Sequence, residues 1–396
     1  MIPELRKRFN ERWNPQLYSE LLRRLEQDSG THISFRCSET PIFLPDALLS
    51  KMARYGQELY QQLEENSGYI QASDAAIPPR FRVPNETAHP LFLQADFGLV
   101  RAPDGILEPK LVEIQGFPSI YGFQALLAST YHHVYRLTDL DSRMTPFLDG
   151  LDETSYWELL RRVILNGHAP EQVVLLEIEP YEQKTLPDFL FTQKRLGIPI
   201  ACITQVERRG RKLYFNGVEI KRIYNRVIVD ELIRKNIRPS FQLTEDLDLE
   251  WAGHPNWFFR ISKFSLPWFR HPCVPETWFL DRLDKLPDDL GNYVLKPLYS
   301  FAGLGVSIGP TKEEIEAIPE NRRPDFILQR KMNFVPTIET PSGPTKIEVR
   351  VMYVWDGTLK PVTTVLRSGR GKMMGVDFNK NLDWVGASAG FCIPQQ

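Results

Sequence analysis

The sequence predicts a mixed α/β fold of two or three domains, on the basis of three observations. With 396 residues, the chain is longer than one simple hydrophobic core requires. Residues 173–206 follow a strand–helix–strand order, which is typical of a small doubly wound α/β unit. The final third consists mainly of short strands and hairpins of antiparallel type, which adds an α+β part to the fold.

The composition is that of a soluble globular protein. Hydrophobic residues make up 42% of the chain and charged residues 25%, and the formal net charge is -2. This balance gives no reason to expect nucleic acid or an anionic membrane as a partner. The four cysteines lack Cys-x-x-Cys spacing, which argues against a disulfide framework or a zinc site. Because no signal peptide or membrane span is evident, we expect a cytoplasmic protein.

The N-terminal part is predicted to be mainly helical. Residues 1–30 indicate a pair of amphipathic helices, and a short strand is expected at residues 33–36. The Pro45-Asp46 pair then begins a helix that extends to about residue 65. Its buried face is marked by apolar side chains at helical spacing, namely Leu48, Leu49, Met52, Tyr55, Leu59 and Leu63.

A predicted hairpin follows, with strands at residues 91–100 and 110–115. The first strand is largely apolar but contains Asp96. In the second strand Glu113 and Gln115 are two residues apart, so their side chains point to one face. Hard cations such as Mg²⁺ prefer oxygen ligands, so these three side chains are candidate metal ligands. The alternative is the solvent-exposed face of an ordinary hairpin.

The middle of the chain is predicted to alternate helices and strands, after a loop that contains Gly122. Arg226, at the end of a strand, is a candidate clamp for a substrate carboxylate, because a guanidinium group binds a carboxylate through two parallel hydrogen bonds. The alternative is a surface salt bridge. The expected elements are a helix at residues 156–165, a strand at 173–178, a helix at 186–196, a strand at 200–206, a hairpin at 212–220 and a helix at 229–235.

The stretch at residues 293–306 is typical of a hairpin lid over phosphate groups. A short strand leads to Lys296, and small residues in the following loop let backbone N–H groups fold around an anion. No helix begins at the glycines, so the stretch is neither a P-loop nor a dinucleotide fingerprint. The alternative is an ordinary glycine turn. The small residues are Ser300, Ala302, Gly303 and Gly305.

Together these motifs resemble the circularly permuted branch of the ATP-grasp ligases, which includes glutathionylspermidine-synthase-like enzymes. Lys263 with Pro275-Glu-Thr277, then Lys296 with its glycine-bearing lid, then residues 327–329, are similar to the first motifs of an ATP-grasp protein. The acidic hairpin is similar to the last, metal-binding motifs, but it stands near the N-terminus. A circular permutation gives this inverted order, and the resemblance covers most of the chain.

The resemblance implies a circularly permuted ATP-grasp fold with a small doubly wound pre-ATP-grasp domain. Residues 1–150 would hold the N-terminal helices and the metal-binding part of the core. Residues 151–250 would form the small α/β substrate domain, and residues 251–396 the nucleotide-binding subdomains with their lid.

The implied activity is the ADP-forming ligation of a small-molecule or peptide carboxylate to an amine through an acyl phosphate, with ATP and Mg²⁺. The resemblance implies that Lys263 and Lys296 bind the α and β phosphates and that residues 300–306 cover the β and γ phosphates. It implies that adenine is bound by Gln329, Lys331 and Met332, and Mg²⁺ by Asp96, Glu113 and Gln115. Arg350 or Arg367 would stabilise the transferring phosphoryl group.

Two positions depart from the family pattern. Gln115 stands where the metal ligand is usually asparagine, and Gln94 stands where related synthetases tend to carry arginine. The alternative function is therefore a nucleotide-binding pseudoenzyme that acts as a scaffold or sensor. Phosphoryl transfer to a small molecule on the same fold is a third hypothesis.

Overall fold

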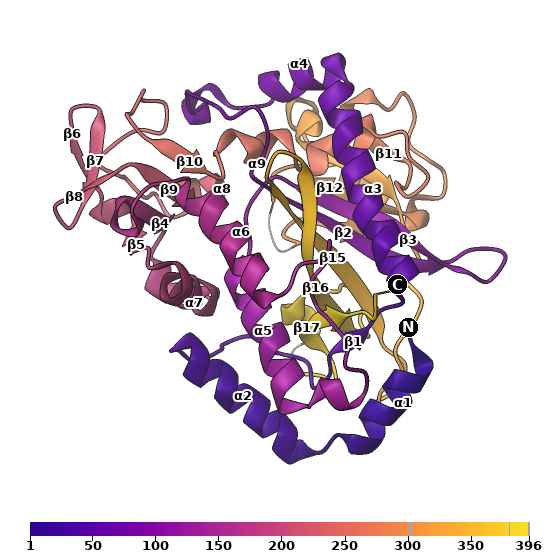
Figure 1. Ribbon diagram of the computed structural model, residues 1–396. Coiled ribbons are helices and arrows are strands. Elements are labelled where there is room, and N and C mark those ends of the chain that lie inside the picture. Colours follow the sequence, from indigo (N-terminus) through magenta and orange to yellow (C-terminus); the bar gives the residue numbers. More distant parts are fainter. Residues whose placement is uncertain (301–302, 380, 395–396) are drawn as a thin grey trace.

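The computed structural model describes residues 1–300, 303–379 and 381–394. It shows a mixed α/β protein, as predicted, in which the described strands form four sheets (Figure 1). None of the described helices is both long and apolar enough to cross a bilayer. The helices are α1 (Pro3–Arg12), α2 (Pro15–Ser29), α3 (Asp46–Glu65), α4 (Ser67–Ala75), α5 (Tyr121–Val134), α6 (Glu153–Leu165), α7 (Leu186–Leu196), α8 (Val229–Arg234), α9 (Asn256–Arg260), α10 (Lys312–Glu316) and α11 (Val376–Asn379).

The largest sheet joins strands from both ends of the chain, in the order β1-β17-β16-β15-β2-β3. Its strands β2 and β15 pair antiparallel, which sets Asp96 opposite Arg350. On the other side of β2, Asp96 lies opposite Glu113 of β3. The acidic hairpin therefore lies directly beside strands of the final third. The strands are β1 (Ile42–Phe43), β2 (Phe92–Arg101), β3 (Leu107–Gln115), β15 (Lys346–Trp355), β16 (Leu359–Gly369) and β17 (Gly386–Phe391).

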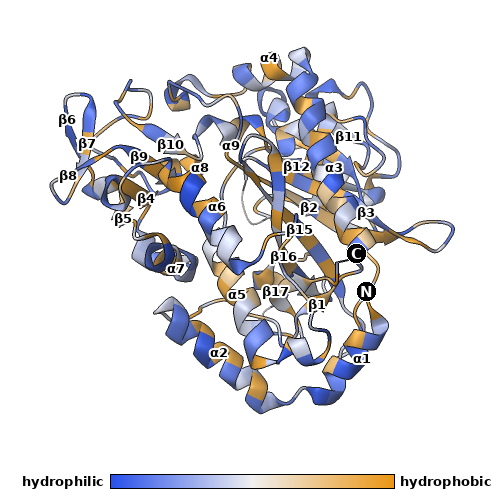
Figure 2. Cartoon of the chain, viewed as in Figure 1, coloured by the Kyte–Doolittle hydropathy of each residue, from blue (hydrophilic) through white to orange (hydrophobic). Residues whose placement is uncertain are grey.

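Alternating apolar side chains of these strands fill a core on each face of the sheet. Leu93 and Phe97 of β2 belong to one core, together with Met52 of α3. Phe92 belongs to the other core, where its ring lies 5.0 Å from that of Tyr121 in α5. Figure 2 shows that apolar residues are concentrated in these central strands. Gln94 and Asp96 follow Phe92 at two-residue spacing, so both are directed to the face of the sheet that Phe92 shares with α5.

The middle of the chain forms a four-stranded parallel sheet in the order β10-β9-β4-β5. Helix α7 connects β4 to β5, which gives the strand–helix–strand unit that the sequence predicts. A three-stranded antiparallel sheet is attached to it, and its β7–β8 hairpin, predicted at residues 212–220, turns at Asn216-Gly217. The strands are β4 (Val173–Glu177), β5 (Ile200–Cys202), β6 (Glu207–Arg209), β7 (Lys212–Phe215), β8 (Val218–Ile220), β9 (Arg222–Asn225) and β10 (Glu250–Ala252).

The fourth sheet is antiparallel, in the order β11-β14-β12-β13. Strand β12 carries Lys296, and its neighbour β14 carries Gln329, which lies opposite Val294. The predicted glycine lid connects β12 to β13. The strands are β11 (Thr277–Phe279), β12 (Tyr293–Pro297), β13 (Ser307–Ile308) and β14 (Phe326–Arg330).

Three local predictions were wrong. The strand expected at residues 33–36 does not form, because the chain here makes only the single bridge of Cys37 with Ala387. The strand expected at 200–206 ends at Cys202, whose backbone N–H donates to Gln205 Oε1 at 3.0 Å and starts a 3₁₀ turn. The loop expected around Gly122 is the buried helix α5, in which a Cβ at position 122 would lie 2.3 Å from Thr192 Oγ1 of α7.

Candidate functional site

A cavity of about 930 Å³ lies where the largest sheet, the β11–β14 sheet and the mid-chain parallel sheet meet. Its volume is in the range of small-molecule and nucleotide sites. Gly305 of the predicted site does not line this cavity, and Ala302 lies outside the described residues. The predicted site residues that line it are Asp96, Glu113, Gln115, Arg226, Lys263, Lys296, Ser300, Gly303, Gln329, Lys331, Met332, Arg350 and Arg367.

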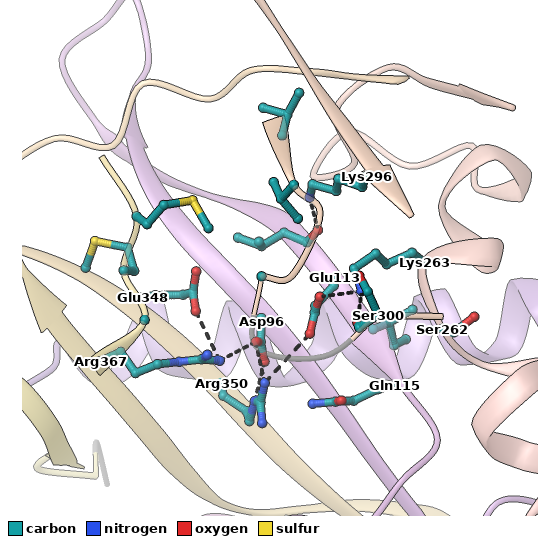
Figure 3. Close-up of a pocket in the computed structure, with 18 of the residues that line it drawn as sticks. Asp96, Glu113, Gln115, Ser262, Lys263, Lys296, Ser300, Glu348, Arg350 and Arg367 are labelled. Carbon is teal, nitrogen blue, oxygen red and sulfur yellow. Dashed lines mark hydrogen bonds and ion pairs between the residues drawn. The ribbon is translucent and has the colours of Figure 1, made fainter. Parts of the chain in front are cut away.

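Both predicted phosphate-binding lysines lie beside strand β3. Lys296 Nζ donates to the carbonyl oxygen of Val112 at 3.0 Å and to Gln329 Oε1 at 2.6 Å. Lys263 Nζ donates to the carbonyl oxygen of Ser300 at 2.6 Å and lies 3.7 Å from Glu113 Oε2 (Figure 3). Residues from the final third and from the acidic hairpin thus line one cavity.

Two buried polar groups, the ammonium group of Lys296 and the amide of Gln329, can interact with a polar ligand. Desolvation lowers the pKa of Lys296 to about 8, because the low-dielectric surroundings disfavour its charged form. Gln329 is 1% exposed, and its Nε2 has no hydrogen-bond partner among the described residues. A buried donor without an acceptor is costly, so a ligand that supplies oxygen or ring-nitrogen acceptors fits here. A nucleotide offers both kinds of acceptor.

Asp96 is held by two arginines that the sequence did not place beside it. Arg350 donates to it twice, from Nε to Oδ1 at 2.5 Å and from Nη2 to Oδ2 at 2.7 Å. Arg367 Nη2 donates to Oδ2 at 2.5 Å. Burial alone would raise the pKa of Asp96, but the two guanidinium groups lower it below its usual value. Asp96 is therefore an ionised carboxylate with both oxygens engaged.

Glu348 is a member of this cluster that the sequence analysis did not select. It is buried and lies opposite Arg367 in the β15–β16 pair. Its Oε1 forms an ion pair with Arg367 Nη2 at 3.1 Å (Figure 3). Burial raises the pKa of Glu348, and Arg367 opposes that shift. Its two-residue spacing from Arg350 was the available signal, because residues at that spacing in a strand share a face.

The predicted metal ligands do not fit a divalent cation in this arrangement. Both oxygens of Asp96 accept from guanidinium groups. The amide oxygen of Gln115, oriented toward the donors around it, accepts from Arg350 Nη1 at 3.0 Å and Nη2 at 2.9 Å. Among the described residues, no group of three or more His, Cys, Asp or Glu side chains is arranged to hold a metal ion. Only Glu113 of the predicted trio keeps longer contacts, of 3.7 Å to Lys263 and 3.9 Å to Arg350.

The lid approaches a second loop across the cavity. Gly303 has φ +76°, and a Cβ at this position would lie 2.9 Å from Met373 Cε. Gly305 has φ +72°, where a Cβ would lie 2.9 Å from Pro297 Cγ. Both positions therefore favour glycine because of their left-handed backbone, and at Gly305 the ring of Pro297 also limits the space. The loop that contains Met373 also reaches the mid-chain unit, where Asp377 Oδ2 is 3.0 Å from Lys184 Nζ.

The mid-chain end of the cavity is lined by carboxyl and amide groups. Arg226, the predicted carboxylate clamp, is 3% exposed and its Nη1 donates to the buried carboxylate of Asp188. Its charge is therefore already balanced within the protein. Glu177, at the carboxyl end of β4, is also buried, and desolvation raises its pKa to about 8. Gln183 and Glu231 line the cavity beside it.

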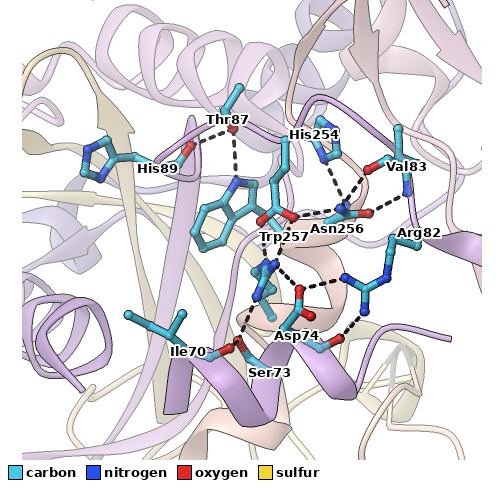
Figure 4. Close-up of polar contacts among 12 residues, drawn as sticks. Ile70, Ser73, Asp74, Arg82, Val83, Thr87, His89, His254, Asn256 and Trp257 are labelled. Carbon is cyan, nitrogen blue, oxygen red and sulfur yellow. Dashed lines mark hydrogen bonds and ion pairs between the residues drawn. The ribbon is translucent and has the colours of Figure 1, made fainter. Parts of the chain in front are cut away.

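A polar network positions the segment that carries Lys263 (Figure 4). Arg260, the last residue of α9, donates to both oxygens of Glu86 and, from Nη2, to Asp74 Oδ1 at 2.8 Å. Asn256 at the start of α9 exchanges two 3.0 Å hydrogen bonds with the backbone of Val83. These contacts hold α9 against the chain around residues 74–86. Because α9 ends three residues before Lys263, they also help to position that lysine.

One cysteine lies in an arrangement that the sequence did not indicate. His271 Nδ1 is 3.0 Å from Cys273 Sγ, and its Nε2 is 3.0 Å from Glu58 Oε2. The thiol is only 1% exposed, and burial raises the pKa of Cys273 to about 12. Nucleophilic cysteines are accessible thiolates, so this group is structural and not catalytic.

Comparison with known proteins shows similarity of fold. No protein-family model matches the chain, and no curated protein matches its sequence. Among solved structures, a glutathione synthetase-like effector from Globodera pallida, in its apo form, is similar with a TM-score of 0.58 and 11% sequence identity. The match covers 96% of this chain and 99% of the effector. The chain therefore has a glutathione synthetase-like fold.

Proposed function

We propose that this protein is a nucleotide-dependent ligase of the circularly permuted ATP-grasp type, which joins a carboxylate to an amine and releases ADP and phosphate. The observation that carries the proposal is the meeting of Lys263, Lys296 and Glu113 in one cavity, although they come from opposite ends of the chain. The glutathione synthetase-like fold supports the same class of reaction. In this proposal residues 1–150 and 251–396 form the catalytic core, and residues 151–250 form the substrate domain.

Nucleotide binding is assigned to the side of the cavity that holds the lysines. Lys263 and Lys296 balance the phosphate charge, and the lid at residues 300–306 closes over the terminal phosphates. Gln329 offers to the nucleotide its Nε2, which has no hydrogen-bond partner in the described part of the chain, and Lys331 and Met332 line the part of the cavity next to it. These groups are held in place before the ligand arrives, so they stabilise charge without reorganising.

The reaction proceeds by two displacements. A carboxylate oxygen of the substrate attacks the γ-phosphorus of ATP, the bond to the bridging oxygen breaks, and ADP leaves with the electron pair. The amine then attacks the acyl carbon, phosphate leaves, and the amine nitrogen loses a proton to water or to a nearby carboxylate. Arg350 and Arg367 line the same cavity, and in this proposal their positive charges stabilise the negative charge that accumulates on the transferring group. No covalent bond to the protein is needed.

The amine is assigned to the mid-chain end of the cavity. Glu177 and Glu231 line that end and favour a cationic or hydrogen-bonding nitrogen, whereas Arg226 is neutralised by Asp188 and offers little to an anion. The carboxylate substrate then lies between this end and the arginines. This order places the reacting carboxylate between the nucleotide and the amine.

Isothermal titration with ATP tests the nucleotide site. Lys296→Ala is expected to abolish binding, because it removes a buried positive charge and leaves the Gln329 amide without its partner. The exposed Lys285→Ala, whose side chain pairs with neighbouring Asp288, is the control and should bind as the natural protein does. Undiminished ATP affinity in Lys296→Ala would contradict the assignment.

A second candidate function is favoured by one observation. Asp96 is bound by two arginines, and the described residues of its cluster form no group of three or more His, Cys, Asp or Glu side chains that could hold a metal ion, which suits a protein that binds nucleotide without turning it over. Release of ADP that requires both a carboxylate and an amine, in a panel of candidate substrates, supports the ligase. ATP binding without ADP release across that panel supports a scaffold or sensor. Transfer of phosphate to a product that retains it would identify a kinase-like activity.

A further inference from the structure

The guanidinium group of Arg350 is surrounded by oxygen acceptors on one side of the cavity. Two of its nitrogens donate to Asp96, and Nη1 donates to Gln94 Oε1 at 3.1 Å. With the Gln115 amide turned so that its oxygen faces these donors, that oxygen lies 3.0 Å from Nη1 and 2.9 Å from Nη2, and Glu113 Oε1 lies 3.9 Å from Nη2. The oxygens of the acidic hairpin, which could otherwise bind a metal ion, therefore surround the guanidinium group of Arg350 from the neighbouring strand β15.

The sheet fixes this arrangement. Arg350 and Asp96 are directly opposite each other on the antiparallel strands β15 and β2, and Met352 is opposite Gln94. A slip of one residue would turn the apolar side chains of both strands out of their cores, so the register is strongly specified. The contact of Arg350 with the acidic hairpin is thus a property of the fold and not of one side-chain rotamer.

The charges of the cluster balance without a metal ion. Every carboxylate has a cation within ion-pair distance, and Arg367 serves both Asp96 and Glu348. Insertion of a divalent ion at Asp96 would strand a buried guanidinium beside a doubly charged metal, which is unfavourable. The groups that balance one another are the carboxylates of Asp96, Glu113 and Glu348 and the cations of Lys263, Arg350 and Arg367.

We infer that Arg350 is the resident cation of the acidic hairpin, so that Asp96 and Gln115 bind no divalent metal ion while Arg350 is present. The inference itself does not depend on the proposed function. Its consequence does: if the protein binds a nucleotide, the affinity for that nucleotide does not depend on a metal ion held by the chain. Phosphate charge is then balanced by side-chain cations, chiefly Lys263 and Lys296.

Direct titration of the nucleotide-free protein with Mn²⁺, followed by electron paramagnetic resonance, tests the inference. The natural protein is expected to bind no Mn²⁺ at this site. Arg350→Gln is expected to gain a site at least about tenfold tighter than any in the natural protein, because it removes one of the two guanidinium groups that hold Asp96 and leaves the cluster with one uncompensated negative charge. Adding Asp96→Asn to Arg350→Gln should remove the gained site.

Arg330→Gln is the matched control, because it removes a positive charge from the same cavity without contacting Asp96. It should leave Mn²⁺ binding unchanged. Tight Mn²⁺ binding by the natural protein that is lost in Asp96→Asn alone would overturn the inference.

A second measurement holds even if Arg350→Gln fails to fold. ATP affinity of the natural protein should be the same within about threefold in EDTA and in Mg²⁺. A requirement for Mg²⁺ of tenfold or more, about 1.4 kcal/mol, would overturn the inference and leave the proposed function standing. Absence of ATP binding in both buffers would overturn the proposed function, and the Mn²⁺ titration would still decide the role of Arg350.

Discussion

Lys296 shows how burial sets the charge of a single residue. Its ammonium group is enclosed by Val112 and Gln329, and desolvation lowers its pKa to about 8. A bound phosphate would favour the charged form and raise that pKa again. Nucleotide binding should therefore be accompanied by uptake of a proton whenever Lys296 is partly neutral beforehand.

ATP affinity is accordingly expected to fall as the pH rises through about 8. Below this pH Lys296 is charged in the free protein and affinity is at its maximum. Above it, affinity falls by up to roughly tenfold per pH unit until the pKa of the bound state is reached. Calorimetric titrations at several pH values measure the slope. Lys296→Arg, which stays charged, should flatten it; an equal slope in that variant would assign the effect to another group.

At this scale the sequence predicts residue types better than their partners. Lys296 and Glu113 could be selected because strand spacing and neighbouring glycines surround them with a recognisable pattern. The bond between Asp96 and Arg350 could not be predicted, because these residues are 254 positions apart and only the strand register brings them together. For the same reason, Arg226 gave no sign that Asp188 would neutralise it.

The lid is the element whose backbone is most constrained. Its glycines at 303 and 305 have positive φ angles, which other residues adopt only with strain, and the space around both is limited by neighbouring side chains. Any other residue at position 303 or 305 would therefore strain the backbone of the lid. Its glycines and lysine were visible in the sequence, whereas its contact with Met373 was not.

Gly305→Ala is expected to weaken ATP binding by about tenfold, because left-handed backbone costs an alanine roughly 1–2 kcal/mol and the methyl group meets Pro297. Gly105→Ala, with φ +85° and open space around it, is the matched control in the β2–β3 turn. Both variants should lose free energy of unfolding in urea, with the larger loss in Gly305→Ala, but only Gly305→Ala should lose affinity in calorimetric titrations. Equal affinities would show that the lid does not contact the nucleotide.

Other elements show where sequence patterns are ambiguous. The helix of residues 46–65 was predicted with its correct start because a proline precedes an apolar stripe of helical period. Helix α5 was missed because it is buried almost all round and starts beside a glycine, so no amphipathic period marks it. Gly122 is needed there for close packing on α7 and not for a turn.

At the scale of the whole molecule, the two ends of the chain flank the same short strand. Ile2 N donates to the carbonyl oxygen of Phe43 at 3.2 Å, and Leu44 N donates to that of Phe391 at 2.8 Å. Figure 1 shows the N and C labels close together beside β1. The mixed α/β fold could be read from the sequence. The pairing of β1 with β17 could not, because strands this short carry little pattern.

A circular permutant should therefore fold. Joining the ends with a short glycine-serine linker and opening the chain at Gly210, in the exposed β6–β7 turn, is expected to keep the melting temperature within about 5 °C and to preserve ATP binding. Thermal unfolding followed by circular dichroism measures this. Opening the chain after Asp96, inside β2, should abolish folding. A permutant opened at Gly210 that unfolds at room temperature would contradict the described placement of the ends.

The wide separation of Asp96 and Arg350 also has a consequence for biosynthesis. The acidic hairpin leaves the ribosome long before its arginine neighbours have been translated, so for most of synthesis β2 has an unpaired edge and uncompensated carboxylates. Contacts between distant positions also form slowly. A prematurely terminated chain would hold only half of the charge cluster, and a working site can assemble only after translation is nearly complete.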